Sequence, residues 1–162
     1  MEAAVDQVSN LAEPPHSIAS AKIDDKGRLK LPSEFLDWLK KSNVFNVFVT
    51  TLDKRTARIY SIPGWKSTLN LLENAGENAR AGSDLALIAK VYGGDAEIDS
   101  QGRILMPAAL RGLLELESQP VFLGCHAGRI DVATKKVHEA RMQIAETNLD
   151  EKLETLEKMG LK

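Results

Sequence analysis

The sequence has few of the features that mark several common classes of protein. One cysteine in 162 residues allows no disulfide within the chain, as is typical of proteins from a reducing compartment. No stretch approaches the ~20 consecutive apolar residues that a membrane span requires. The first residues also lack the basic-then-apolar layout of a secretory signal. These absences predict a cytoplasmic protein with no membrane partner.

An excess of basic residues is lacking as well. The chain has 21 Lys and Arg against 23 Asp and Glu, which gives a formal net charge of −2. Many DNA-binding proteins are strongly basic because they neutralise phosphates. The average composition therefore argues mildly against a nucleic-acid partner. The objection weakens if basic residues gather on one face, or if several copies of a weak site act together.

The residue types that serve catalysis and metal binding are scarce and scattered. His126 and His138 have no serine or carboxylate constellation beside them in the sequence. Cys125 and His126 are adjacent, which is a poor spacing for a zinc site. We expect Cys125 to be buried at the end of a strand and His126 to lie on the surface. The sequence predicts neither an enzyme nor a metal or cofactor site.

What the sequence does contain is an internal repeat. The segment A-K-I-D-D-K-G-R-L-K-L-P at 21–32 recurs as A-E-I-D-S-Q-G-R-I-L-M-P at 96–107. Ala, Ile, Asp, Gly, Arg and Pro are identical at matching places, and apolar positions farther along also match. Self-similarity of this kind indicates a duplicated module. We predict four parts, which are a mobile arm at 1–17, modules at 18–92 and 93–145, and a helical tail at 146–162.

Each module shows the same order of predicted elements. A short strand leads into a polar turn, and Gly27 or Gly102 is expected to take the left-handed position of that turn. A second strand alternates polar and apolar residues, although Leu105 makes the outer face of the second copy less polar. Pro32 and Pro107 then mark the start of a short amphipathic helix. The remaining strands are predicted at 44–52, 58–62, 120–124 and 129–133.

Each module ends in helix. Ser83 is the predicted N-cap of the helix that closes the first one, and apolar residues between 137 and 159 form one stripe at the end of the second. A sheet as short as that of either module is difficult to bury alone. We therefore predict an α+β fold in which the two modules form one pseudo-two-fold β-barrel core with flanking helices.

The repeated D-x-x-G-R string has two interpretations. In the structural one, Asp24 caps the amides of the turn, Gly27 supplies the left-handed residue, and Arg28 pairs with a carboxylate. In the functional one, the arginine contacts phosphate or guanine, and the aspartate orients its guanidinium. The arginine is kept in both copies while its neighbours drift, which favours DNA contact. The first hairpin also carries three lysines, Lys22, Lys26 and Lys30.

The second copy has the same polar framework with less positive charge. Arg103 is predicted to play the role of Arg28, with Asp99 and Gly102 supporting it. Gln101 can hydrogen-bond to phosphates or base edges without charge. The three lysines of the first copy are replaced by Glu97, Gln101 and Leu105.

Two D-x-x-G-R…P segments at this spacing resemble the MraZ family of bacterial transcriptional regulators, over residues 18–145. The resemblance implies two AbrB-like (SpoVT-AbrB) swapped-hairpin modules in a nucleoid-associated DNA-binding protein. It also implies recognition of short direct repeats upstream of a cell-division and cell-wall operon, by a homo-oligomer in the form of a ring. In such a ring several copies of a weak site would act together, so the negative net charge of one chain would not argue against DNA binding. The DNA-facing arginines of the family fall on Arg28 and Arg103, with Asp24 and Asp99 as their motif partners.

Two other functions stay open. The basic hairpins could instead meet an acidic protein partner or serve ring assembly only, which would make the chain an interaction scaffold. It could also be an antitoxin-type DNA-binding module with a toxin-wrapping tail. A second module argues against the antitoxin, because antitoxins of this kind usually have one.

Overall fold

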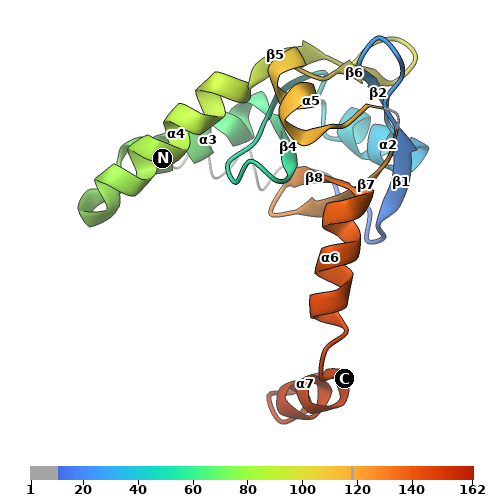
Figure 1. Ribbon diagram of the computed structural model, residues 1–162, viewed down its shortest axis with the longest axis vertical. Coiled ribbons are helices and arrows are strands. Elements are labelled where there is room, and N and C mark those ends of the chain that lie inside the picture. The colour runs from blue at the N-terminus through green and yellow to red at the C-terminus, as the bar shows by residue number, and fades with distance from the viewer. Residues whose placement is uncertain (1–10, 118) are drawn as a thin grey trace.

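The computed structural model describes residues 11–117 and 119–162, which form an α+β fold (Figure 1). The first half contains β1 (Ala19–Lys22), β2 (Arg28–Lys30), α2 (Ser33–Lys41), β3 (Asn46–Thr50), β4 (Ala57–Ser61), α3 (Ile62–Glu73), η1 (Gly76–Asn78) and α4 (Ala79–Tyr92). The second half contains β5 (Gly94–Glu97), β6 (Arg103–Leu105), α5 (Ala108–Leu114), β7 (Pro120–His126), β8 (Arg129–Thr134), α6 (Lys135–Ala145) and α7 (Leu149–Glu157). Among these residues, no helix is both long and apolar enough to cross a membrane.

The two halves exchange their first strands. Six strands form one sheet in the order β1-β7-β8-β4-β3-β5. β1 pairs antiparallel with β7 of the second half, with Ala19 opposite Leu123. β5 pairs antiparallel with β3 of the first half, with Ala96 opposite Val47. Each half therefore completes the sheet of the other.

The remaining strands, β2 and β6, pair with each other in a separate two-stranded ladder. They meet β1 and β5 only through single bridges, Ile23 to Leu29 and Ile98 to Ile104. The predicted closed barrel is wrong for the described residues, because β1 and β5 remain the edges of the larger sheet. The physical reason is length, since β2 and β6 have three residues each and use all of them to pair across the halves.

The larger of two hydrophobic clusters lies between the six-stranded sheet, the β2–β6 ladder, α2 and α5. It draws on both halves, and most of its residues have almost no exposed surface. Leu29 and Ile104 face each other in the ladder and are both 0% exposed. Burying a side chain of this size contributes about 1.5–3 kcal/mol. Sharing these side chains removes the difficulty that neither half can bury its own sheet.

The short helices begin where the prolines predict. Pro32 and Pro107 stand immediately before α2 and α5, as suits residues with a fixed φ and no N–H to satisfy. The N-cap predicted at Ser83 is wrong, because α4 already begins at Ala79 and Ser83 is an exposed residue inside it.

Close packing between α3 and α4 accounts for that earlier start. The two helices lie side by side as a projecting hairpin (Figure 1). A Cβ added at Gly82 would come 2.0 Å from the carbonyl oxygen of Leu72. Glycine at this point lets the backbones approach, so tertiary packing outweighs its low intrinsic helix propensity.

The predicted arm contacts the body of the protein at Ala12. The backbone N–H of Ala12 donates to Ser42 Oγ at 2.9 Å, and Trp38 Nε1 donates to the carbonyl oxygen of Ala12 at 2.8 Å. Ala12 is therefore bonded to α2 and to the residue after it, and the mobility of the arm stays a prediction. Residues 1–10 of the arm lie outside the described residues.

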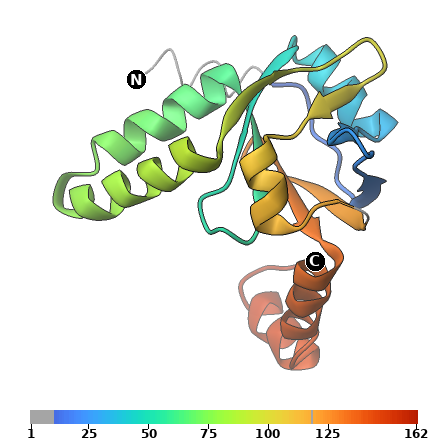
Figure 2. The same ribbon diagram turned by 45° about the horizontal axis from the view of Figure 1, so that its top comes forward.

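The carboxyl-terminal stripe is not one continuous helix. It divides into α6 and α7 at a turn in which Asn148 has a φ of 56°. Both helices project from the body of the protein, with α7 at the far end (Figures 1 and 2). All residues from Arg141 to Lys162 are exposed.

Candidate nucleic-acid interface

The first D-x-x-G-R turn is held together by the carboxylate of Asp24. Its Oδ1 accepts hydrogen bonds from the backbone N–H groups of Lys26 at 3.0 Å and Arg28 at 2.9 Å. Its Oδ2 accepts from Arg28 Nε at 2.9 Å. Gly27 closes the turn with a φ of 84°, a left-handed conformation that costs glycine little. The structural interpretation of the motif thus describes this turn correctly.

The second turn repeats this arrangement. Asp99 Oδ1 accepts from the backbone N–H groups of Gln101 at 2.8 Å and Arg103 at 2.9 Å, and Oδ2 accepts from Arg103 Nε at 3.3 Å. Gly102 has a φ of 75°. Both glycines therefore adopt the left-handed conformation predicted from the sequence.

Both aspartates stay ionised at neutral pH. The hydrogen bond from the Arg28 backbone N–H is the main cause that lowers the pKa of Asp24 below its ordinary 3.8. The corresponding bond from Arg103 lowers the pKa of Asp99. Each carboxylate also holds the Nε of its own arginine, so the direction of the guanidinium group is fixed.

The outer nitrogens of both arginines are left available. In residues 11–117 and 119–162, the Nη atoms of Arg28 and Arg103 make no hydrogen bond. The two side chains are 30% and 25% exposed. A guanidinium anchored at Nε with free Nη atoms can still donate to a phosphate or a base edge.

The two turns are tied to each other as well as to themselves. The backbone N–H of Leu31 donates to the carbonyl oxygen of Gly102 at 3.0 Å, and that of Met106 donates to the carbonyl oxygen of Gly27 at 2.9 Å. These reciprocal bonds extend the β2–β6 ladder at both ends. The turns thus form one rigid ribbon instead of two independent loops.

One face of this ribbon is buried and the other carries the predicted site residues. Leu29 and Ile104 point into the core, so their neighbours along each strand point outward. The register places Lys30 opposite Arg103 and Arg28 opposite Leu105. The outward face therefore brings together two arginines and one lysine from segments about 75 residues apart in the sequence.

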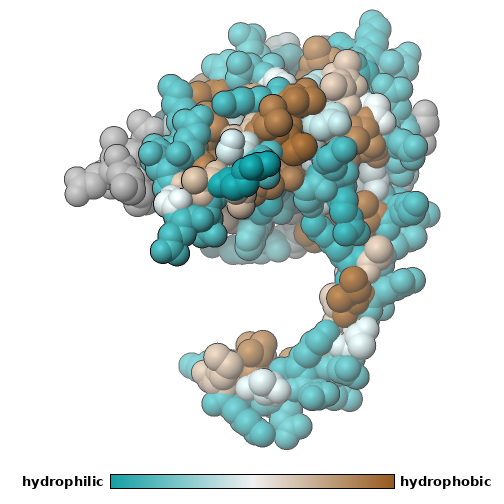
Figure 3. All heavy atoms as spheres, turned by 60° about the vertical axis from the view of Figure 1, so that its left-hand side comes forward, coloured by the Kyte–Doolittle hydropathy of each residue, from teal (hydrophilic) through white to brown (hydrophobic). Residues whose placement is uncertain are grey.

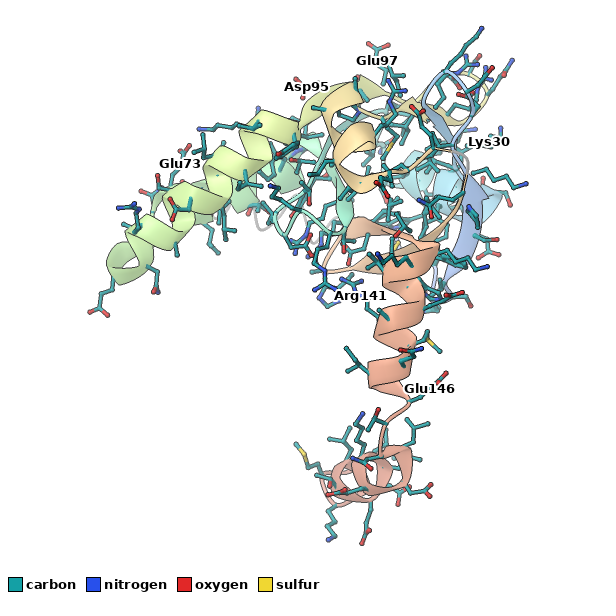
Figure 4. The ribbon with its side chains drawn as sticks, viewed as in Figure 1. Lys30, Glu73, Asp95, Glu97, Arg141 and Glu146 are labelled. Carbon is teal, nitrogen blue, oxygen red and sulfur yellow. The ribbon has the colours of Figure 1, made fainter. Side chains whose placement is uncertain are left out.

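The other predicted contacts surround this face. Lys22 is exposed at the end of β1, and because its neighbour Ile23 bridges to Leu29, it lies on the same side as Lys30. Lys26 is exposed at the tip of the first turn. The ammonium group of Lys30 donates to the carbonyl oxygen of Gln101, which joins the two turns again. Figure 4 shows Lys30 at the part of the molecule that carries the β2–β6 ribbon.

The charges around the ribbon are unequal, as the sequence predicts. Residues 22–30 contain four basic and two acidic side chains, whereas residues 97–105 contain one basic and two acidic ones. Glu97 is exposed on β5, and Figure 4 shows it with Asp95 on the outer edge. Leu105 is 55% exposed, which confirms the less polar outer face of the second copy.

Sequence reasoning missed the role of Arg111. Its side chain lies under the first turn, where Nε donates to the carbonyl oxygen of Met106 at 3.1 Å and Nη1 pairs with Glu117 at 2.9 Å. A Cβ added at Gly27 would come 2.2 Å from Arg111 Nη1, while one at Gly102 would meet Leu36. Each turn is thus supported by the helix of the opposite half. No sequence signal identifies this crossed packing.

The cysteine and histidine near the end of β7 have ordinary environments. Cys125 is half-buried, and burial raises the pKa of its thiol to about 11. The thiol is therefore protonated, and a poor nucleophile, at neutral pH. His126 is exposed, as expected.

Comparison with known proteins places the chain among transcriptional regulators. No protein-family model matches it. It is 31% identical to the transcriptional regulator MraZ of Acidobacterium capsulatum over 127 residues, which are 78% of this chain and 84% of that protein. It is 32% identical to the protein of the same name from Thermoanaerobacter sp. over 144 residues, 86% of this chain and 94% of that protein. The MraZ protein of Pediococcus pentosaceus is 28% identical over 139 residues.

Proposed function

Because the chain belongs to the MraZ family of transcriptional regulators, we propose that it acts by binding double-stranded DNA through the β2–β6 ribbon. Arg28 and Arg103 contact phosphates or guanine edges, and Lys22, Lys26 and Lys30 add phosphate contacts. Gln101 contributes an uncharged hydrogen bond. Asp24, Gly27, Asp99 and Gly102 hold the two turns in shape.

The observation that carries this proposal is the pairing of both turns in one ribbon with a polar outward face. A two-stranded β-ribbon is narrow enough to enter the major groove, where each base pair presents a distinct pattern of donors and acceptors. Arg28 and Arg103 enter it pre-oriented by their aspartates. Such pre-orientation lowers the entropy that is lost on binding.

The strand exchange supports the further proposal that the halves are AbrB-like swapped-hairpin modules, bounded at 18–92 and 93–145. In this arrangement one chain supplies what two chains would supply in a dimer. The site is therefore complete in one molecule, although the two turns carry different charge.

Because the net charge of the chain is negative, several ribbons are expected to act together on DNA. A chain of net charge −2 gains little from long-range attraction to DNA, so the affinity of a single ribbon is expected to be modest. We propose a homo-oligomeric ring, as the family resemblance implies, in which several ribbons engage consecutive direct repeats and gain affinity through effective concentration. The target that the resemblance implies is the promoter of a cell-division and cell-wall gene cluster, at the nucleoid.

A gel-retardation assay tests this function, with DNA from upstream of the gene that encodes this chain, at two salt concentrations. We expect binding that weakens steeply with salt, because each neutralised phosphate releases counterions. Arg28→Ala should weaken binding by about 1–3 kcal/mol, and Arg103→Ala should weaken it as well, because each removes one guanidinium that its aspartate holds in place.

The matched control is Arg80→Ala. Arg80 is 92% exposed on the α3–α4 hairpin, away from the ribbon, and its loss should leave the retardation unchanged. Equal retardation by the parent, Arg28→Ala and Arg103→Ala would refute the ribbon assignment. Absence of any DNA binding by the parent would favour the scaffold instead.

A further inference from the structure

The last helix, α7, exposes an apolar face that nothing in the described chain covers. Leu149, Leu153 and Leu156 are each about half exposed, at 50%, 48% and 47%, and helical spacing places them on one side. Figure 3 shows hydrophobic surface along this projecting arm. A nine-residue helix is shorter than the ~12–15 residues that an isolated helix needs to be stable in water. Packing against a partner would supply the missing stability.

The geometry of the connection keeps α7 away from the body of its own chain. Lys152 Nζ donates to the carbonyl oxygens of Ile144 at 3.4 Å and Ala145 at 3.2 Å, at the carboxyl end of α6. Figure 4 shows Glu146 at this far end, while Arg141 lies nearer the body. The contact anchors α7 one helix length from the sheet, so its apolar face is available to another molecule.

A groove at the base of α6 has the chemistry to receive such a helix. It encloses about 360 Å³. Its apolar lining comes from α5 and α6, namely Leu113, Leu114, Val137 and Ala140. Its charged lining is mainly basic, with Lys54, Arg55 and Lys136 against Glu115. Neither Arg55 nor Lys136 has an ion-pair partner within the described residues.

Charge matches this groove to α7. Within its bounds α7 carries four acidic residues, Asp150, Glu151, Glu154 and Glu157, and one lysine. Asp150 and Glu157 directly follow Leu149 and Leu156, so they border the apolar face and can reach the basic rim. The alternative groove beside α3 and α4 offers one lysine and one glutamate, Lys90 and Glu73, already paired at 3.6 Å. It offers no comparable attraction.

We propose that α7 of one copy docks in the α5–α6 groove of a second copy. The mode is an amphipathic helix in an apolar groove with a charged rim. Groove and helix are different surfaces, so the contact is heterologous and closes into a ring or continues as a filament. This inference rests on the self-association in the proposed function and specifies the interface that produces it.

Sedimentation of the full chain over a range of concentrations tests the docking. Leu153→Glu places a charge in the apolar face, and the concentration required for assembly beyond the 17.8 kDa chain should rise at least about tenfold. Thr155→Glu adds the same charge on the opposite, polar side of α7 and should leave assembly unchanged. Because residue 153 is exposed in the single chain, the substitution does not disturb its fold. Unchanged assembly of Leu153→Glu overturns the inference.

Charge reversal identifies the groove. The pair Arg55→Glu/Lys136→Glu makes the rim acidic, and the pair Asp150→Lys/Glu157→Lys makes α7 basic. Each variant alone should assemble poorly, and an equal mixture should recover assembly, because each helix then meets a groove of opposite charge. Failure of the mixture to recover overturns the inference.

Failure of the inference and failure of the proposed function remain distinguishable. Arg28→Ala should keep the parent's sedimentation and weaken DNA retardation, because Arg28 does not line the groove. If the parent sediments as a single chain at all concentrations, both the proposed assembly and the docking are refuted. If the parent assembles and substitutions in α7 do not change its assembly, the docking is refuted and the proposed assembly stands.

Discussion

The two D-x-x-G-R turns have the same backbone and the same hydrogen bonds but different surroundings. In both, an aspartate accepts from two backbone N–H groups and from the Nε of its arginine. The first copy carries Lys22, Lys26 and Lys30, and its turn is supported by Arg111, whereas the second copy has Glu97, Gln101 and Leu105 at the matching positions, and its turn is supported by Leu36. The turn geometry has thus been kept while the charge around it has not.

This difference separates two requirements of the ribbon. Geometry is needed in both turns, because each carbonyl at the turn glycine accepts a hydrogen bond from the opposite strand. If the ribbon binds DNA as proposed, the lysine beside the arginines can come from either half, because positions 30 and 105 share one outward face. Loss of geometry in either turn should therefore damage the whole ribbon, whereas charge can be moved from one half to the other.

The largest effect is expected from the turn glycines. Gly27→Ala and Gly102→Ala each force a side chain into the left-handed region, which costs about 1–3 kcal/mol of stability. Gly27→Ala should cost more, because its Cβ displaces the Arg111 guanidinium from Met106 and Glu117, whereas at Gly102 only the end of Leu36 must move. Denaturant unfolding measures both.

Gly112→Ala is the control for the glycine pair. Gly112 lies in α5, and nothing lies within 4 Å of its added Cβ. This substitution should stabilise the protein by up to about 1 kcal/mol. Equal unfolding midpoints for Gly27→Ala, Gly102→Ala and the parent would show that the turns do not need their left-handed residue.

A smaller effect is expected from moving one charge across the ribbon. Leu105→Lys gives the second half the lysine that the first has at position 30, and Lys30→Leu removes it. Leu105→Lys should raise DNA affinity several-fold and steepen the salt dependence by about one charge, and Lys30→Leu should do the reverse. The double variant should return near the parent if charge counts only in total.

The control for added charge is Leu87→Lys, which places a lysine at a 60% exposed position on α4, away from the ribbon. The salt dependence of DNA binding, measured by titration at several salt concentrations, compares the parent with these four variants. A Leu105→Lys variant that behaves like Leu87→Lys would contradict the assignment of the ribbon face.

The smallest effect concerns pH. The pKa values of Asp24 and Asp99 are lowered by hydrogen bonds that form only in the folded turns. Each carboxylate therefore stabilises the fold above its ordinary pKa of 3.8, and this stability is lost as the pH falls through the lower folded-state pKa. The stability difference between the parent and Asp24→Asn or Asp99→Asn should be present at pH 7 and disappear in acid. A difference that does not change with pH would assign the effect to shape instead of charge.

Much of this structure follows from local patterns. The repeat, the left-handed glycines and the alternation in β2 and β6 follow from residues a few positions apart. The outward face of the ribbon was also predictable, because Leu29 and Lys30 must point to opposite sides of a strand. The aspartate in each turn behaves as its side-chain chemistry dictates.

The parts that local patterns could not supply depend on contacts between distant segments. Nothing in β1 or β5 indicates that each will pair with a strand of the other half, since alternation fixes a buried face but not a partner. The same crossing brings Arg111 under Gly27. The start of α4 depends on the close contact of Gly82 with Leu72. The capping preference of Ser83 carries no information about this contact.

Lysine footprinting with and without the upstream DNA tests the central claim most directly. Acetylation followed by mass spectrometry reports which ammonium groups the DNA covers. The ribbon predicts protection of Lys22, Lys26 and Lys30, with no change at Lys66 and Lys90, which are exposed on the α3–α4 hairpin. Protection of the hairpin lysines with continued reactivity at Lys22, Lys26 and Lys30 would contradict it.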